Sequence, residues 1–161
     1  MPVTRDIVAT YRGPGAVMRR LLADNAREDR ALAMVMAGCA VMFIAQWPRL
    51  ARQAHLESVD LNPLLGAALL AWVFIAPLIL YALAFLAFLL ARLLGGKGTT
   101  LDARIALFWA LLATSPLVLL HGLVAGFIGT GLQLQLVGAV WFLAFIWFWL
   151  TNMRVAGWSP K

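Results

Sequence analysis

The sequence predicts an all-α fold: a polytopic transmembrane helix bundle of about four spans, with short amphipathic helices before it. Two observations on composition point there, because 63% of the residues are hydrophobic and only 12% are charged. A soluble domain carries roughly 25% charged residues, so this chain could not cover its apolar surface in water. A third observation is that the basic residues lie between and before the apolar runs, as flanks of spans do. In a bilayer, helices satisfy their own backbone polar groups.

Residues 1–30 form a predicted cytoplasmic amphipathic segment. It contains two short stretches with an apolar face, separated by the helix-breaking run Gly13-Pro14-Gly15. In the second stretch Arg19 and Arg20 point away from the apolar face, so they are candidate contacts for lipid headgroups. Two arrangements stay open: the helices lie on an anionic membrane surface, or they pack on the bundle.

Residues 31–152 are predicted to form the transmembrane bundle, followed by a cytoplasmic tail over 153–161. The predicted spans are 31–47, 64–94, 104–128 and 132–150. Pro48-Arg49 is expected to end the first span, and a polar loop is expected over 48–62.

The second span is unusually long. It is an almost unbroken apolar run that would reach about 46 Å as one helix, longer than a hydrocarbon core of about 30 Å. We therefore expect one tilted helix with a kink near Pro77, stopped by Gly95-Gly96. After it, Thr99 and Asp102 have the spacing of a capping box, which predicts the start of a new helix.

The distribution of positive charge predicts the orientation. Of the 13 Lys and Arg residues, all but Arg49 and Arg52 fall in the N-terminal segment, at the loop after the second span or in the tail. Because cytoplasmic loops carry the excess of Lys and Arg, both termini are expected on the cytoplasmic side of a bacterial inner membrane.

Polar groups inside the spans are few. His121 and Thr114 lie two turns apart on nearly the same face of the third span, so Thr114 is a candidate hydrogen-bond partner for His121. A neutral histidine that ties helices together is the first interpretation, and a proton or ligand site in a small transporter or channel is the alternative.

Small residues mark the third span as the most buried one. Ser115, Gly122, Gly126 and Gly129 are candidate helix-packing residues, and Gly122 and Gly126 match the small-xxx-small pattern of close helix pairs. Packing within this chain and packing against another copy both remain possible at this point.

No catalytic constellation is recognisable. The predicted spans hold no Asp or Glu, Cys39 is the only cysteine, and Ser115 and His121 face different ways on one helix. We therefore expect no catalytic residues, no metal, no cofactor and no nucleic-acid partner. The expected partners are membrane lipids and other membrane proteins or further copies of this chain.

The layout also resembles a known family. Arg19-Arg20-Leu21-Leu22, then Glu28-Asp29-Arg30-Ala31-Leu32 leading into spans marked by Pro and Gly, is similar to the bacterial branch of the Yip family, the Ypt/Rab-interacting membrane proteins. The resemblance implies a helical membrane protein. In eukaryotic relatives it implies binding of prenylated small GTPases, typically with five spans and an Asp-Leu-Tyr-Gly-Pro element that this chain lacks.

The leading functional hypothesis from the sequence is a non-enzymatic scaffold or accessory subunit of a larger membrane complex. A small transporter or channel that uses His121 is one alternative. A lipid-interacting protein that organises the membrane through its basic N-terminal helices is another.

Overall fold

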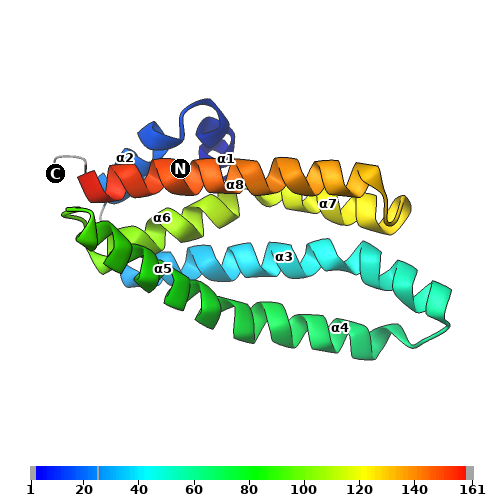
Figure 1. The fold of residues 1–161 in the computed structure, drawn as a ribbon. Coiled ribbons are helices and arrows are strands. Elements are labelled where there is room, and N and C mark those ends of the chain that lie inside the picture. The colour runs from blue at the N-terminus through cyan, green and yellow to red at the C-terminus, as the bar shows by residue number, and fades with distance from the viewer. Residues whose placement is uncertain (1–2, 25, 159–161) are drawn as a thin grey trace.

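The computed structural model describes residues 3–24 and 26–158, and within them the fold is an all-α bundle, as predicted. Figure 1 shows long helices lying side by side, with two short helices against one flank. The helices are α1 (Val3–Arg12), α2 (Pro14–Ala23), α3 (Glu28–Glu57), α4 (Leu61–Leu69), α5 (Ala76–Leu93), α6 (Thr100–Ala113), α7 (Ser115–Phe127) and α8 (Leu132–Trp158), and a π-helical stretch, η1 (Leu70–Ile75), joins α4 to α5.

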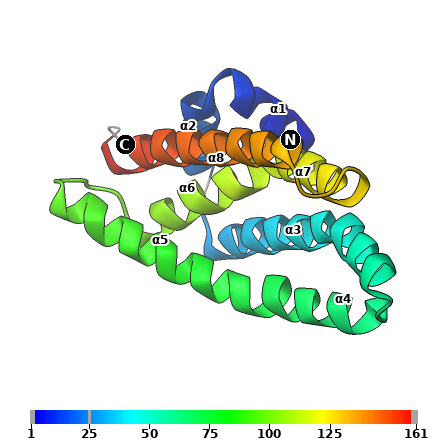
Figure 2. The ribbon, with the colours of Figure 1, turned by 45° about the vertical axis from the view of Figure 1, so that its right-hand side comes forward.

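Three helical stretches in the described residues are long and apolar enough to cross a membrane: α3, the continuous helix Leu61–Leu93, and α8. A fourth crossing results if α6 and α7, which meet at a bend of 45°, count as one broken span. Figures 1 and 2 favour that count, because α7 continues from α6 toward the end of the bundle where α3 and α4 meet. The pair thus runs the length of the bundle.

Helix α6 is the centre of the fold. Every residue from Ile105 to Ala113 is buried, because α3, α5 and α8 surround this helix. Asn152 of α8 reaches into this core and donates its Nδ2 hydrogen to the carbonyl oxygen of Ala106 at 3.1 Å. The expectation that the third span contains the most buried helix is confirmed for its first half.

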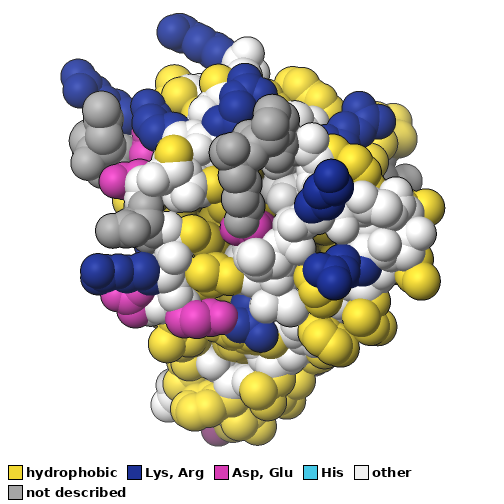
Figure 3. Space-filling view, turned by 90° about the vertical axis from the view of Figure 1, so that its left-hand side faces the viewer, with side chains coloured by type: hydrophobic (Ala, Val, Ile, Leu, Met, Phe, Trp, Pro, Cys, Tyr) yellow, Lys and Arg dark blue, Asp and Glu magenta, His cyan; other side chains and the backbone are white. Residues whose placement is uncertain are grey.

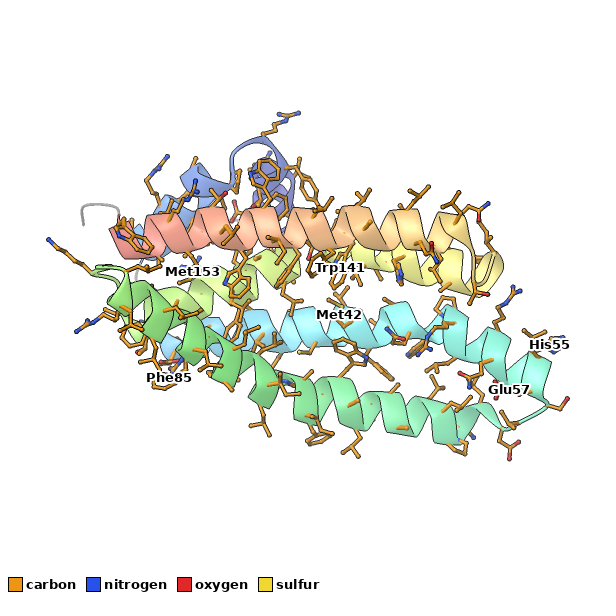
Figure 4. The ribbon with its side chains drawn as sticks, in the orientation of Figure 1. Met42, His55, Glu57, Phe85, Trp141 and Met153 are labelled. Atoms are coloured by element: carbon orange, nitrogen blue, oxygen red, sulfur yellow. The ribbon has the colours of Figure 1, made fainter. Side chains whose placement is uncertain are left out.

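The expected end of the first span at Pro48 is wrong. Helix α3 continues through Pro48 to Glu57, so most of the predicted loop over 48–62 is helical. Proline removes one backbone donor and kinks a helix without necessarily ending it. Here the helix is held on both sides of Pro48, because α3 packs against α7 and α4. The extended end of α3 carries His55 and Glu57 outward (Figure 4).

The long second helix is confirmed. It runs from Leu61 to Leu93, and Gly95 follows it with a positive φ of 84° that glycine adopts without strain. The irregular turn of this helix is η1, which ends just before Pro77. Because the proline ring blocks a normal hydrogen bond to the preceding turn, a widened π turn at this place has a physical cause.

The third predicted span is two helices. The expected capping box is present, since Thr99 Oγ1 accepts from the Asp102 amide at 3.2 Å and Asp102 Oδ2 accepts from the Thr99 amide at 2.9 Å. The span then breaks at Thr114, two residues before Pro116. The correction to 104–128 is therefore an earlier start, at Thr100, and a break in the middle.

The fourth helix is longer than predicted. Helix α8 passes the expected end at Leu150 and reaches Trp158, so most of the predicted tail over 153–161 is helical; residues 159–161 lie outside the described part. The extra turns are held by α2 and by the loop before α6, where the Lys97 amide donates to the carbonyl oxygen of Gly157 at 2.8 Å.

Candidate functional site

The glycine face of α7 packs against α3 within this chain. A Cβ atom added to Gly122 would lie 2.9 Å from the carbonyl carbon of Ala45, and one added to Gly126 would lie 2.8 Å from that of Pro48. Real Cβ atoms essentially never come closer than 3.0 Å to such atoms. The small-xxx-small pattern therefore serves contact between two helices of one copy, which decides between the two possibilities left open by the sequence.

The other two candidate packing residues, Ser115 and Gly129, lie at the two ends of this contact between α7 and α3, which we call the α3–α7 seam. Ser115 is buried in the first turn of α7. Gly129 lies just after α7 with a φ of 89°, and a Cβ atom there would come within 2.9 Å of the Arg52 guanidinium. All four candidates thus lie along or at the ends of α7.

Arg52 lies at the end of the α3–α7 seam and was not predicted from the sequence. Its Nη1 donates to the carbonyl oxygens of Gly126 and Phe127 at 3.2 and 3.3 Å, and so caps the end of α7. A cation at the C-terminus of a helix stabilises the free carbonyls and the helix dipole. No sequence pattern indicated this contact, because Arg52 was expected in a loop.

The expected hydrogen bond between Thr114 and His121 is wrong. The Thr114 hydroxyl instead donates within its own turn, to the carbonyl oxygens of Ala110 at 3.1 Å and Leu111 at 2.9 Å. His121 is half-buried and lies against α8, where its Nε2 is 3.3 Å from the position that a Cβ of Gly138 would occupy. Deeper between α3 and α8, Met42 and Trp141 belong to a small apolar cluster (Figure 4).

The N-terminal helices are packed on the bundle. Val17, Met18 and Leu21 of α2 are buried and belong to the main core, and α2 lies along the second half of α8. Helix α1 is tied to α6 by a buried hydrogen bond, in which Trp109 Nε1 donates to Thr10 Oγ1 at 3.1 Å. The structure therefore shows both N-terminal helices packed on the bundle.

The two candidate headgroup contacts on α2 differ in their surroundings. Both are exposed, and Arg20 in addition forms an ion pair with Asp6 of α1. Figure 3 looks onto the end of the bundle that the N-terminal helices flank, and Lys and Arg side chains are spread around it. Two further ion pairs lie at this end: Glu28 with Arg104, and Asp24 with Arg30.

A cavity of about 490 Å³ lies between α1, α2, α3 and α6. Its wall combines charged and apolar side chains, which include Asp6, Arg20, Asp24, Arg30, Met34, Trp109 and Leu112. Cavities of about 300 to 1,000 Å³ with a few polar groups are typical binding sites for small molecules. The arrangement suits an amphiphilic ligand, with one polar and one apolar part.

Within residues 3–24 and 26–158, no three or more His, Cys, Asp or Glu side chains come together in a way that could hold a metal ion. No family model, no curated protein and no solved structure matches this chain.

Proposed function

We propose that the protein is a non-enzymatic membrane protein that acts through helix packing, as a scaffold or an accessory subunit of a larger membrane assembly. The observation that carries this proposal is an apolar groove of about 440 Å³ between α5 and α8. The helices that form it keep most of their apolar surface outside the chain's own core. Only 17% of the apolar window in Leu61–Leu93 and 6% of that in α8 are buried.

The groove fits the side of an apolar helix from another membrane protein. Its lining includes the small side chains of Ala87 and Ala91 and the rings of Trp149 and Trp158. Within lipid, helices associate through close packing and polar contacts, because the hydrophobic effect does not distinguish a helix from a lipid tail. Arg154 also lines the groove and is exposed, so a partner helix with an acidic residue at that depth complements it.

A photo-cross-linking amino acid placed in the groove tests the proposal in the native membrane. Leu90 lines the groove and is 62% exposed, whereas Leu78 lies on the same helix outside the groove and is 72% exposed. We expect a discrete protein adduct at Leu90 and only lipid adducts at Leu78. Gentle solubilisation, native-gel sizing and mass spectrometry of the adduct then identify the partner or a second copy of this chain.

Two outcomes contradict the proposal. One is lipid adducts alone at both positions, and the other is a lone monomer in mild detergent with no partner in stoichiometric amount. Either result would leave the groove as ordinary lipid-facing surface.

The proposed location is a bacterial inner membrane, with both termini on the cytoplasmic side. One support is the asymmetry of Lys and Arg along the chain. The other is structural: the Glu28–Arg104 ion pair and the hydrogen bond from Lys97 to Gly157 bring the start of α3, the loop before α6 and the end of α8 to the same end of the bundle. Membership of the bacterial Yip branch is proposed on the sequence resemblance alone. GTPase binding is not part of the proposal.

A further inference from the structure

Along α3, the lining of the cavity beneath the N-terminal helices changes from charged to apolar. Arg30, Ala33 and Ala37 of α3 all line it, one turn after another. At 1.5 Å per residue, Ala37 lies about 10 Å further along the helix than Arg30. The polarity of the cavity therefore changes along α3 from a guanidinium to small apolar side chains.

Helix α6 runs parallel to α3 (Figure 1), and its cavity-lining residues show the same change. The ion pair of Glu28 with Arg104 holds the first turns of α3 and α6 together. Trp109 and Leu112 of α6 line the cavity one to two turns after Arg104. The apolar end of the cavity is thus the deeper one, toward the middle of the bundle, and the charged end lies where the two helices begin.

The charged end holds Asp24 and Arg30, and Arg20 lies one turn before Asp24 on α2. Arg20 is paired with the buried Asp6, and Arg30 Nη1 lies 3.4 Å from Asp24 Oδ2. The side chain of Asp24 is 77% exposed, so its carboxylate remains accessible to a ligand. A neighbouring hollow that shares Asp24 and Arg30 adds one more of each sign, Arg27 and Asp29.

This combination of charges selects for a type of headgroup. Guanidinium groups bind phosphate oxygens through paired hydrogen bonds, and carboxylates accept hydrogen bonds from a protonated amine. A headgroup with a phosphate and a primary amine satisfies both sets. An anionic headgroup without an amine satisfies only the arginines and places negative charge beside the carboxylates.

We propose that this cavity binds one membrane phospholipid with a zwitterionic, amine-bearing headgroup. The headgroup lies at Asp24 and Arg30, and part of an acyl chain lies along Ala33, Ala37 and Leu112. Ala33 and Ala37 are themselves exposed on the side of α3, so the lipid enters laterally from the bilayer. This inference goes beyond the proposed scaffold role and does not depend on it.

The test measures lipid retention by native mass spectrometry of the full chain in detergent. The probe is dioleoyl phosphatidylethanolamine, compared with dioleoyl phosphatidylglycerol, which has the same tails, and with soluble phosphoethanolamine, which has no tail. Ala37→Phe fills the cavity, and Ala33→Phe does so at a second position. Ala40→Phe is the matched control, because Ala40 is exposed on the same helix and does not line the cavity.

We expect one phosphatidylethanolamine per protein, with an apparent affinity about tenfold higher than for phosphatidylglycerol. Ala37→Phe and Ala33→Phe should each lower the affinity for phosphatidylethanolamine about tenfold, and Ala40→Phe should leave this affinity unchanged. Asp24→Asn should remove the preference for the amine-bearing lipid without weakening phosphatidylglycerol. Circular dichroism and gel filtration establish that each variant is folded, and a misfolded variant at one position leaves the other to decide.

Three results overturn the proposal: equal retention of both lipids by the unmodified chain, equal retention of phosphatidylethanolamine by the filling variants and the control, or displacement of the lipid by soluble phosphoethanolamine at equal concentration. The last result would assign the site to a free phosphorylated amine.

Discussion

Arg52 of α3 caps α7 by donating from Nη1 to the carbonyl oxygen of Gly126, a residue 74 positions further along the chain. The contact joins the end of α3 to the end of α7, and Gly129 leaves room for the guanidinium beside them. This half-buried arginine thereby joins the part of α3 beyond Pro48 to the turn that leads into α8.

Replacing Arg52 should therefore loosen this end of the bundle. Arg52→Ala removes two charge-assisted hydrogen bonds to helix-end carbonyls, and we expect a loss of about 1 to 2 kcal/mol in unfolding free energy. Arg49→Ala is the control, because the exposed Arg49 bonds only to Gln46 of its own helix. Thermal unfolding in detergent measures both. An equal, small effect of the two variants would mean that the cap contributes nothing.

The glycines of α7 should not tolerate a methyl group. Gly122→Ala and Gly126→Ala place a Cβ atom against the α3 backbone, and overpacking of this kind costs about 1 to 3 kcal/mol. Gly66→Ala is the matched control, since nothing lies within 4 Å of a Cβ atom there and alanine favours the helix. Denaturation in mixed micelles gives the order of stability. A Gly122→Ala variant as stable as Gly66→Ala would contradict the close contact of α3 and α7.

The docking of α1 should depend on Thr10. Thr10→Val keeps the size of the side chain but leaves the buried Trp109 Nε1 without its acceptor, at a cost of about 1 to 3 kcal/mol. Because this bond joins α1 directly to the central helix α6, we expect faster trypsin cleavage at the N-terminal arginines. Thr4→Val, at an exposed position of the same helix, should leave the cleavage rate unchanged. Equal rates for both variants would show that the hydrogen bond does not hold α1.

Substitution of His121 separates the packing interpretation from the transport alternative. If His121 only packs against Gly138, then proteoliposomes that contain His121→Ala and the unmodified protein should show the same proton flux, at the level of lipid alone. A flux above that background that disappears in His121→Ala would support the small transporter or channel instead.

The proposed orientation in the membrane can be tested by labelling single cysteine variants. The native Cys39 is 0% exposed, so it should react slowly and give little background. A membrane-impermeant maleimide should label Ser58→Cys, in the turn between α3 and α4, in intact cells. It should label Lys97→Cys, before α6, only after the membrane is opened. The reverse pattern would place both termini outside.

Much of the fold follows from local sequence signals. The break at Gly13 and Pro14, the capping box of Thr99 and Asp102 and the stop at Gly95 were predicted, because each depends on residues within about one turn of one another. The course of α3 beyond Pro48 was not predictable in this way. A proline near the end of an apolar run resembles a helix end unless other helices hold the chain on both sides of it.

The candidate sites were less predictable than the helices. The glycines of α7 were recognised as packing residues, but their partners Ala45 and Pro48 were not, since the pattern contains no information on the facing helix. Thr114 was misassigned because a shared helix face does not show which acceptor a hydroxyl prefers, and its own turn offers two.

The sequence by itself determined that this chain is an all-α protein with helices suited to a bilayer, because composition and periodicity act over neighbouring residues. Only the tertiary structure decided that α1 and α2 pack on the bundle, that the α7 glycines face α3, and that a charged and apolar cavity lies beneath the N-terminal helices. These features join groups as far apart as Thr10 and Trp109, 99 positions along the chain. The packing of helices brings such groups together, and no local pattern encodes it.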